Sequence, residues 1–339
     1  MTPAVALPST SMPTVDSAWI DVVDVGHGSC VVIRNGESVV VVDTGPGGAI
    51  LEYLRQQSID HIDAVILSHA DADHIGGLSA ILSQPIPVGR IIWNGDALKS
   101  STLWLDLVYQ LADLHRQGVV SATENATEGM TVAAGSDDIT VRILAPGVAL
   151  QHLPPGSRDR SGRQVTSNSA SVVAQVIVGG QPVLLIPGDL DELGLAHLDE
   201  AGLRPDLGTR FLLLPHHGGR CGSEAATRSM TAFLMSAVSP EAILVSNGRR
   251  RFGNPRQDVL DTIREVAPTI KISCTQLAES CSRLATAHAD ADPSYSAGWL
   301  RGYSCAGTMR IFIDPEMNTH MNHHRHDEFL TASVPAHRC

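Results

Sequence analysis

Four residues with metal-binding side chains follow one apolar run within six positions of this chain. Residues 64–67 predict a buried strand, and they lead directly to His69, Asp71, Asp73 and His74. Imidazole and carboxylate are the ligands that zinc and related cations prefer. Because core packing requires no such cluster, the spacing predicts a metal site at the end of a strand.

The same pattern recurs along the chain, since further apolar runs end in acidic or imidazole side chains. Asp43 follows one such run, Asp189 follows another, and His216 and His217 follow a third. The carboxyl ends of strands converge at one edge of a layered fold, and binding sites form there. Strands that alternate with helical segments indicate an α/β arrangement of sheets with helices packed outside them. Helices are expected at 49–57, 77–83, 101–117, 224–235 and 257–266.

The composition limits the classes of partner. The net charge of −12 disfavours broad nonspecific attraction to nucleic acid, and the aromatic share of 4% disfavours a surface built on base stacking. This composition does not exclude a local phosphate-binding groove formed by either of two arginine groups, although solvated loop charge is the simpler interpretation for each. They are Arg158, Arg160 and Arg163, and Arg249, Arg250 and Arg251.

The 339 residues suggest one main domain over 18–314. Residues 1–17 predict a flexible lead without the features of a secretory signal, and residues 315–339 predict a mobile, His-rich tail. No apolar run approaches the roughly 20 residues of a membrane span, so we expect a cytoplasmic protein. Cys274, Cys281 and Cys305 are expected to be buried free thiols, with a small structural metal site or a redox-labile pair as the alternatives.

Taken together, the motifs resemble those of the metallo-β-lactamase superfamily. They are Asp43-Thr44-Gly45, the His-x-Asp-x-Asp-His-x-Gly-Gly run from His69, Gly188-Asp189, and Pro215-His216-His217-Gly218. Within the superfamily, the chain is similar to the soluble hydrolase domain of the ComEC family of competence DNA-uptake proteins. Residues 24–29 resemble that family's Asp-Val-Gly-Gln-Gly-Asp turn, and residues 168–172 its Asn-x-x-Ser-x-Val stretch. Phosphorylcholine esterases of bacterial surfaces are similar in the same motifs.

The resemblance covers roughly residues 18–313 and implies an αββα four-layer sandwich of two mixed β-sheets flanked by helices. It also implies a site for two divalent metal ions, zinc first and manganese as the alternative. By position, one ion would take His69 and Asp71, the other Asp73, His74 and His217, and Asp189 would bridge them. His216 would bind substrate or transfer a proton, although the sequence barely separates it from His217. Asp43 would orient a ligand histidine.

Three positions depart from the family pattern. Asp71 and Asn168 stand where many members have histidine, which leaves a harder site that is more open to manganese. Asn254 stands where the family has the histidine of a Gly-His-Pro element. His27 and Arg251 are further residues that we expect around the ions or the substrate.

The function predicted from these residues is a metal-dependent phosphodiesterase, using a hydroxide bridged by two metals. Its substrate would be a nucleotide, a cyclic dinucleotide or a nucleic-acid phosphodiester, with Asp73, Asp189 and His216 as the catalytic residues. Two alternatives remain open. One is a hydrolase of a thioester, lactone or β-lactam, and the other is a non-catalytic, metal-binding regulatory module.

Overall fold

The structure, a computed structural model, describes residues 18–96, 99–249, 251–281 and 295–334. The expected N-terminal lead, residues 1–17, lies outside this range. Among the described helices, none has the length and apolarity that crossing a lipid bilayer requires.

The first half of the chain and two late strands form a mixed eight-stranded sheet in the order β15-β14-β1-β2-β3-β4-β5-β6. The strands from β15 to β3 pair antiparallel, and those from β3 to β6 pair parallel. Their bounds are β1 Ala18–Val22, β2 Val31–Asn35, β3 Ser38–Val42, β4 Ile62–Ile66, β5 Val88–Trp93, β6 Val120–Asn125, β14 Met309–Ile313 and β15 Thr319–Met321.

The second half forms a mixed seven-stranded sheet in the order β13-β12-β11-β10-β9-β8-β7. Here β7 to β10 pair antiparallel and β10 to β13 pair parallel. The bounds are β7 Thr131–Ala134, β8 Ser136–Ala145, β9 Val173–Val178, β10 Gln181–Ile186, β11 Phe211–Leu213, β12 Ala242–Val245 and β13 Lys271–Cys274.

The two sheets pack face to face over a shared apolar core. In β2, Val31 and Ile33 point into this core, whereas Val32 points outward to the helices beside the first sheet. Successive side chains of a strand alternate between the two faces. Because both faces are covered, central strands such as β3, β11 and β12 are nearly continuous apolar runs.

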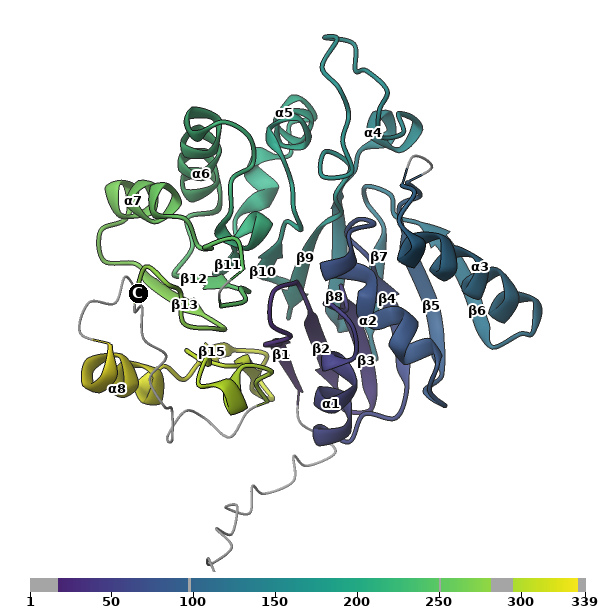
Figure 1. Cartoon of the computed structure of the whole chain (residues 1–339), viewed down its shortest axis with the longest axis horizontal. Coiled ribbons are helices and arrows are strands. Elements are labelled where there is room, and N and C mark those ends of the chain that lie inside the picture. Colours follow the sequence, from purple (N-terminus) through teal and green to yellow (C-terminus); the bar gives the residue numbers. More distant parts are fainter. Residues whose placement is uncertain (1–17, 97–98, 250, 282–294, 335–339) are drawn as a thin grey trace, which may run out of the picture.

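Helices cover the outer face of each sheet (Figure 1). The first sheet carries α1 Ala49–Gln56, α2 Ala72–Leu82 and α3 Thr102–Arg116, and the second carries α5 Glu192–Glu200, α6 Glu224–Val238 and α7 Gln257–Val266. Shorter pieces are α4 Val148–His152, η1 Arg204–Leu207, η2 Pro215–Gly218 and η3 Trp299–Arg301. The predicted αββα sandwich of two mixed sheets flanked by helices is confirmed.

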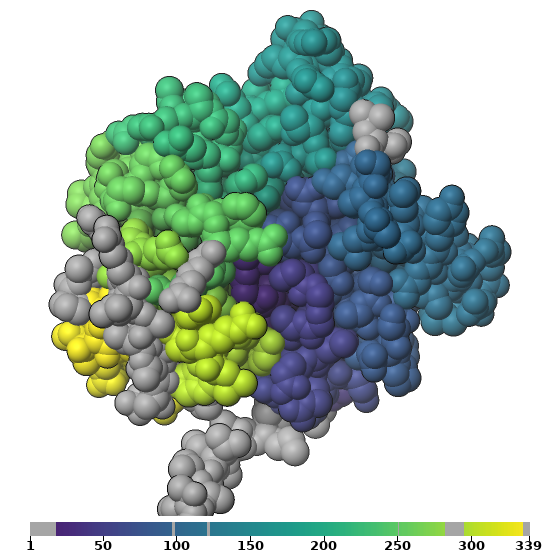
Figure 2. All heavy atoms as spheres, in the orientation of Figure 1, coloured from purple at the N-terminus to yellow at the C-terminus, as the bar shows by residue number. Residues whose placement is uncertain are grey.

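Two expectations about local structure are wrong. The helix expected at 77–83 begins at Ala72, because Asp71 has an extended backbone and the turn that follows it is already helical. Residues 319–333 are not a tail without regular structure. They form β15, which pairs with β14, and α8 (His324–Ser333), whose Leu330 is buried in the core of the second sheet. Figure 2 shows these yellow C-terminal residues beside the green residues of that half.

Candidate metal centre

The candidate ligands come from loops at one edge of the sandwich. Asp43 follows β3 and His69 follows β4, and these strands are parallel neighbours. Asp189 follows β10 and His217 follows β11, which are parallel neighbours in the other sheet. The loops approach closely at Gly188, where a Cβ atom would lie 2.9 Å from the Cβ of Ser68. A glycine therefore lets the Asp189 loop reach the motif after β4.

Two groups of side chains meet at this edge. His69, His74 and Asp189 form one, and His27, Asp73 and His217 form the other, with the ligand atoms of each group within 4.8 Å of one another. Asp189 connects them, because its Oδ1 lies 3.2 Å from Nε2 of His74 and 3.7 Å from Nε2 of His217. Five of the six expected metal ligands belong to these groups.

The grouping differs from the expected one in two respects. His74 lies with His69 and Asp189 instead of beside Asp73. Its place beside Asp73 is taken by His27, whose Nε2 is 3.4 Å from Asp73 Oδ2. His27 comes from the loop between β1 and β2, which folds over the edge, so its proximity to the motif after β4 depends on tertiary structure.

Asp71, the sixth expected ligand, is shared between two neighbours. Its Oδ2 lies 3.6 Å from Nε2 of His69, and its Oδ1 accepts a hydrogen bond from the ammonium of Lys99. Sequence reasoning missed Lys99, since a single lysine after β5 carries no pattern that marks it. Its charge now lies beside one of the two candidate groups.

The ligand histidines are oriented through their other ring nitrogens. Nδ1 of His74 lies 2.7 Å from Asp43 Oδ2, and Nδ1 of His217 lies 2.8 Å from the carbonyl oxygen of Ser246. Nδ1 of His69 lies 3.0 Å from the hydroxyl of Ser68, which itself donates to Asp43. These contacts direct each Nε2 atom toward the centre, an arrangement typical of metal-binding histidines.

The chemistry of the inward-facing atoms fits a divalent cation. Nε2 of His69, His74 and His217 and Oδ1 of Asp189 are buried, and within the described residues they form no hydrogen bond of good geometry. A buried polar atom without a hydrogen bond costs about 1–3 kcal/mol. Convergence of four such atoms on one region is explained by a cation that ligates them.

The protonation states are those of ligands. Burial and the nearby His74 lower the pKa of His69 to about 4, and burial and His217 lower that of His27 to about 4. Burial opposes ionisation of Asp73 and Asp189, yet the His217 imidazole 3.5 Å from Asp73, and the charge of His74 beside Asp189, hold both pKa values below the usual range. The carboxylates are therefore charged at neutral pH.

His74 is the exception among these histidines. Burial would lower its pKa, but Asp189 and Asp43 outweigh burial and raise the pKa well above the usual value. Without a metal, His74 therefore holds a proton that partly balances the carboxylates. Because a ligand histidine must lose that proton from Nε2, metal binding and protonation compete here.

His216 and His217 differ in exposure although they are adjacent. The side chain of His217 is 4% exposed, whereas that of His216 is 32% exposed and places Nδ1 3.1 Å from Asp189 Oδ2. Asn168 and Asn254, two of the residues expected near the substrate, flank His216. The amide of Asn168 lies 3.5 Å from Nδ1 of His216, and that of Asn254 donates to its carbonyl oxygen at 3.3 Å.

Three residues of the centre adopt the left-handed backbone conformation, with φ of 57° at Asp43, 52° at His216 and 57° at His217. This conformation is uncommon for residues other than glycine, and such strain gathers at functional sites. It orients both imidazoles of the Pro215–Gly218 turn toward Asp189. The sequence offered no sign of it, because no glycine occupies these positions.

The two arginine groups differ in pairing and exposure. Arg160 pairs with Glu200 at the end of α5 and Arg163 pairs with Asp159, so the charges of both arginines are compensated. Arg249 is buried and donates to the carbonyl oxygen of Leu277, and Arg250 lies outside the described residues. Arg251 is exposed beside the centre, with its guanidinium 5.2 Å from the ring of Phe252.

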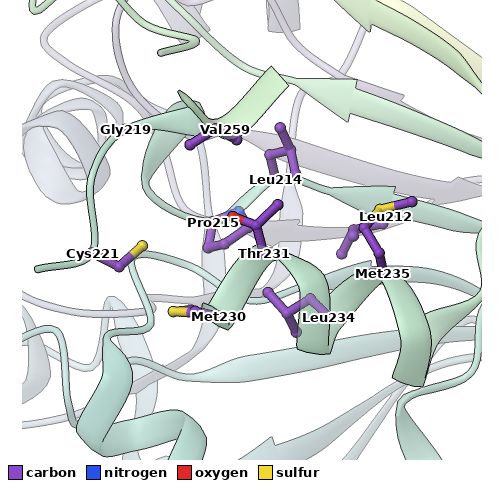
Figure 3. Close-up of a pocket in the computed structure, with 10 residues that line it drawn as sticks. All are labelled: Leu212, Leu214, Pro215, Gly219, Cys221, Met230, Thr231, Leu234, Met235 and Val259. Carbon is purple, nitrogen blue, oxygen red and sulfur yellow. The ribbon is translucent and has the colours of Figure 1, made fainter. Parts of the chain in front are cut away.

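An apolar cavity lies behind the turn that carries His216 and His217 (Figure 3). It is enclosed by β11, α6 and the start of α7, and its lining residues are Leu212, Leu214, Pro215, Gly219, Cys221, Met230, Thr231, Leu234, Met235 and Val259. None of the candidate ligands lines it. The cavity is therefore a packing feature of the second core and lies outside the metal centre.

Comparison with known proteins agrees with this fold and centre. The profile of the Metallo-beta-lactamase superfamily matches residues 23–131, which include β2, β3, β4 and the His69–His74 motif. The predicted resemblance to the metallo-β-lactamase superfamily is confirmed.

Two curated relatives match over most of this chain. The chain is 27% identical over 267 residues to Competence protein ComA of Neisseria gonorrhoeae, covering 77% of this chain and 31% of the relative. It is 23% identical over 269 residues to ComE operon protein 3 of Bacillus subtilis, covering 72% and 30%. The chain thus spans less than a third of the length of these relatives. The solved metallo-beta-lactamase fold protein YhfI from Bacillus subtilis is 13% identical, with 76% and 96% coverage and a TM-score of 0.47.

Proposed function

We propose that this chain is a phosphodiesterase that works with two divalent cations, zinc or manganese. The observation that carries the proposal is the pair of His/Asp groups joined by the buried carboxylate of Asp189. His69, His74 and Asp189, with Asp71 beside them, would hold one cation. His27, Asp73 and His217 would hold the other, with Asp189 between the two.

The chemistry of such a pair suits phosphodiester cleavage. When bound, two cations supply a hydroxide nucleophile at neutral pH and stabilise the attacking and leaving oxygens of an in-line displacement. Asp73 and Asp189 hold the negative charge that binds them, and Asp43 keeps the His74 ring in its ligand orientation. The oxygen-rich set of Asp71, Asp73 and Asp189 favours hard cations and phosphate oxygens over thiolate-type chemistry.

His216 is the residue that we assign to proton transfer. Its Nδ1 lies beside Asp189, and its exposed side chain leaves Nε2 for the substrate. A histidine in this position can donate a proton to the departing alkoxide. Asn168 and Asn254 hold the ring and the backbone of His216 in place.

The charge of the chain favours a small phosphodiester over long nucleic acid. With a net charge of −12, Arg160 and Arg163 paired and Arg249 buried, the described surface offers little positive charge for a long nucleic-acid backbone. A nucleotide, a cyclic dinucleotide or a short oligonucleotide needs only the centre and a few contacts around it.

Metal analysis combined with a substrate panel tests this function. Purified chain would be loaded with Zn²⁺ or Mn²⁺ and offered bis(p-nitrophenyl) phosphate, a lactone, a thioester and nitrocefin. We expect bound metal and turnover of the phosphodiester, and loss of both in Asp73→Ala and Asp189→Ala. The control is Asp60→Asn, whose side chain is 91% exposed and remote from the ligand loops.

Each alternative class has a distinct result. Preference for the lactone, thioester or nitrocefin would indicate that the chain is a hydrolase of a different class. Metal binding by the wild type without turnover of any substrate would indicate a regulatory module and would contradict the proposal.

A further inference from the structure

An exposed aromatic ring stands at the edge of the metal centre. Phe252, in the loop between β12 and α7 (Figure 1), is 66% exposed. Its ring centroid lies 4.8 Å from that of His27, and the His27 ring lies 4.6 Å from that of His217. Phe252 therefore packs directly on one candidate ligand, His27, which in turn packs on another, His217.

The backbone holds this ring in place. Phe252 has φ of 59°, a left-handed conformation that a bulky side chain rarely adopts without support from its surroundings. At Gly248, earlier in the same loop, a Cβ atom would lie 2.4 Å from the backbone nitrogen of His27. The loop that carries Phe252 thus packs directly on the loop that carries His27.

Gln276 links the two loops. Its Nε2 donates to Asp24 Oδ1 at 2.9 Å, and Asp24 begins the turn that contains His27. Its Oε1 accepts from the backbone nitrogen of Arg249 at 2.9 Å, three residues before Phe252. Both contacts are buried. The ring is therefore preorganised relative to the centre, which reduces the entropic cost of stacking on it.

Arg251 places a cation on the same surface. Its guanidinium lies 5.2 Å from the Phe252 ring centroid, and no ion pair to a carboxylate is formed by Arg251 among the described residues. A guanidinium matches the geometry of a phosphate group, whereas an aromatic ring stacks with any base. The Phe252 ring contacts both His27 and the Arg251 guanidinium, so a base contact and a phosphate contact would both lie beside the metal centre.

We propose that Phe252 and Arg251 form a nucleotide-recognition subsite, in which Phe252 stacks on a base and Arg251 binds a phosphate next to the one that is cleaved. The inference rests on the proposed phosphodiesterase function and narrows its substrate to nucleotide phosphodiesters. Phe252 determines specificity and takes no part in bond cleavage.

The test compares an aromatic with a non-aromatic ligand on the metal-loaded chain. KM and kcat are measured for a 5′-phosphorylated dinucleotide and for glycerophosphoethanolamine, a diester without rings. The affinities of AMP and inorganic phosphate are measured by calorimetry. Phe252→Leu keeps an apolar contact with His27 but removes the stacking face. Tyr109→Leu, an exposed aromatic on α3, is the matched control.

We expect Phe252→Leu to raise KM for the dinucleotide and Kd for AMP by about tenfold, within the range that base stacking contributes. Its kcat, its metal content and its KM for glycerophosphoethanolamine should stay at wild-type values. Arg251→Gln should raise KM for the dinucleotide and reduce the salt dependence of its binding. Tyr109→Leu should behave as the wild type.

Unchanged AMP and dinucleotide binding in Phe252→Leu would overturn the subsite, as would a wild type that binds AMP no more tightly than inorganic phosphate. If the wild type cleaves no diester but Phe252→Leu still weakens AMP binding, the subsite stands and the proposed function fails. The two conclusions can therefore be separated.

Discussion

Oδ2 of Asp43 lies 2.7 Å from Nδ1 of His74, and both side chains are completely buried. The contact orients the ring so that Nε2 faces Asp189. Outer partners of this kind typically change metal affinity by 10- to 100-fold. Asp43 is therefore the residue whose loss should weaken the centre without removing a ligand.

Asp43→Asn tests that contact. Asparagine tolerates the left-handed backbone at this position, so the change removes a charged acceptor without added strain. We expect the dissociation constant for Zn²⁺, measured by chelator competition, to rise about 10- to 100-fold. Wild-type affinity in a folded Asp43→Asn chain would show that His74 needs no such orientation.

Substitution with asparagine should distinguish the roles of His216 and His217. Asparagine tolerates the left-handed backbone conformation that both residues adopt. His217→Asn is expected to lower the number of bound metal ions, because a buried ligand is lost. His216→Asn should keep the metal content and lower kcat by about 10²- to 10⁴-fold, the range for an acid–base group. Elemental analysis and steady-state kinetics check both. Loss of metal in His216→Asn alone would reverse the assignment.

Lys99 should compete with a cation at the His69 side of the centre. Its ammonium pairs with Asp71, so it occupies a carboxylate that the cation would otherwise bind and would repel that cation. Solvent reduces this repulsion, so we expect Lys99→Met to tighten metal binding by about tenfold in calorimetry. Lys271→Met, which removes a pair with Asp327 at a distant surface, is the control. Weaker binding in Lys99→Met would show that Lys99 supports the site.

A buried ion pair across β1 and β14 should dominate local stability. Arg310 donates two hydrogen bonds to Asp21, at 2.8 and 2.6 Å, and Asp21 is fully buried. Arg310→Met leaves the buried carboxylate of Asp21 without its cationic partner, with only the hydroxyl of Tyr53 still donating to it among the described side chains, so the free energy of unfolding should fall by about 3–5 kcal/mol in urea titrations. Arg116→Met, which breaks an exposed pair, should cost less than about 1 kcal/mol. Equal losses of unfolding free energy in Arg310→Met and Arg116→Met would contradict this account.

Much of the centre could be predicted because its signals are local. An apolar run that ends near Asp43, His69 or Asp189 indicates both a buried strand and a candidate ligand at its end. The start of α2 was predicted too late, at Gly77, because several motif residues have weak helix preference. In the structure the helix begins at Ala72, directly after Asp71 at its N-cap.

Long-range contacts could not be predicted. His27 was expected around the ions or the substrate, but its contact with Asp73 depends on a loop that Asp24 anchors to Gln276, 252 positions later. Lys99 reaches Asp71 through a loop with no periodic pattern. These contacts depend on tertiary packing, which a short stretch of sequence does not reveal.

The C-terminal strand also has a practical consequence. A shortened chain that stops at Asp314 would leave the backbone of β14 without a neighbour on one side, because β15 is the outermost strand there. Unprotected strand edges recruit other chains and promote aggregation. Expression of this hydrolase for crystallisation should therefore retain the sequence through Val334, although the motifs themselves end much earlier.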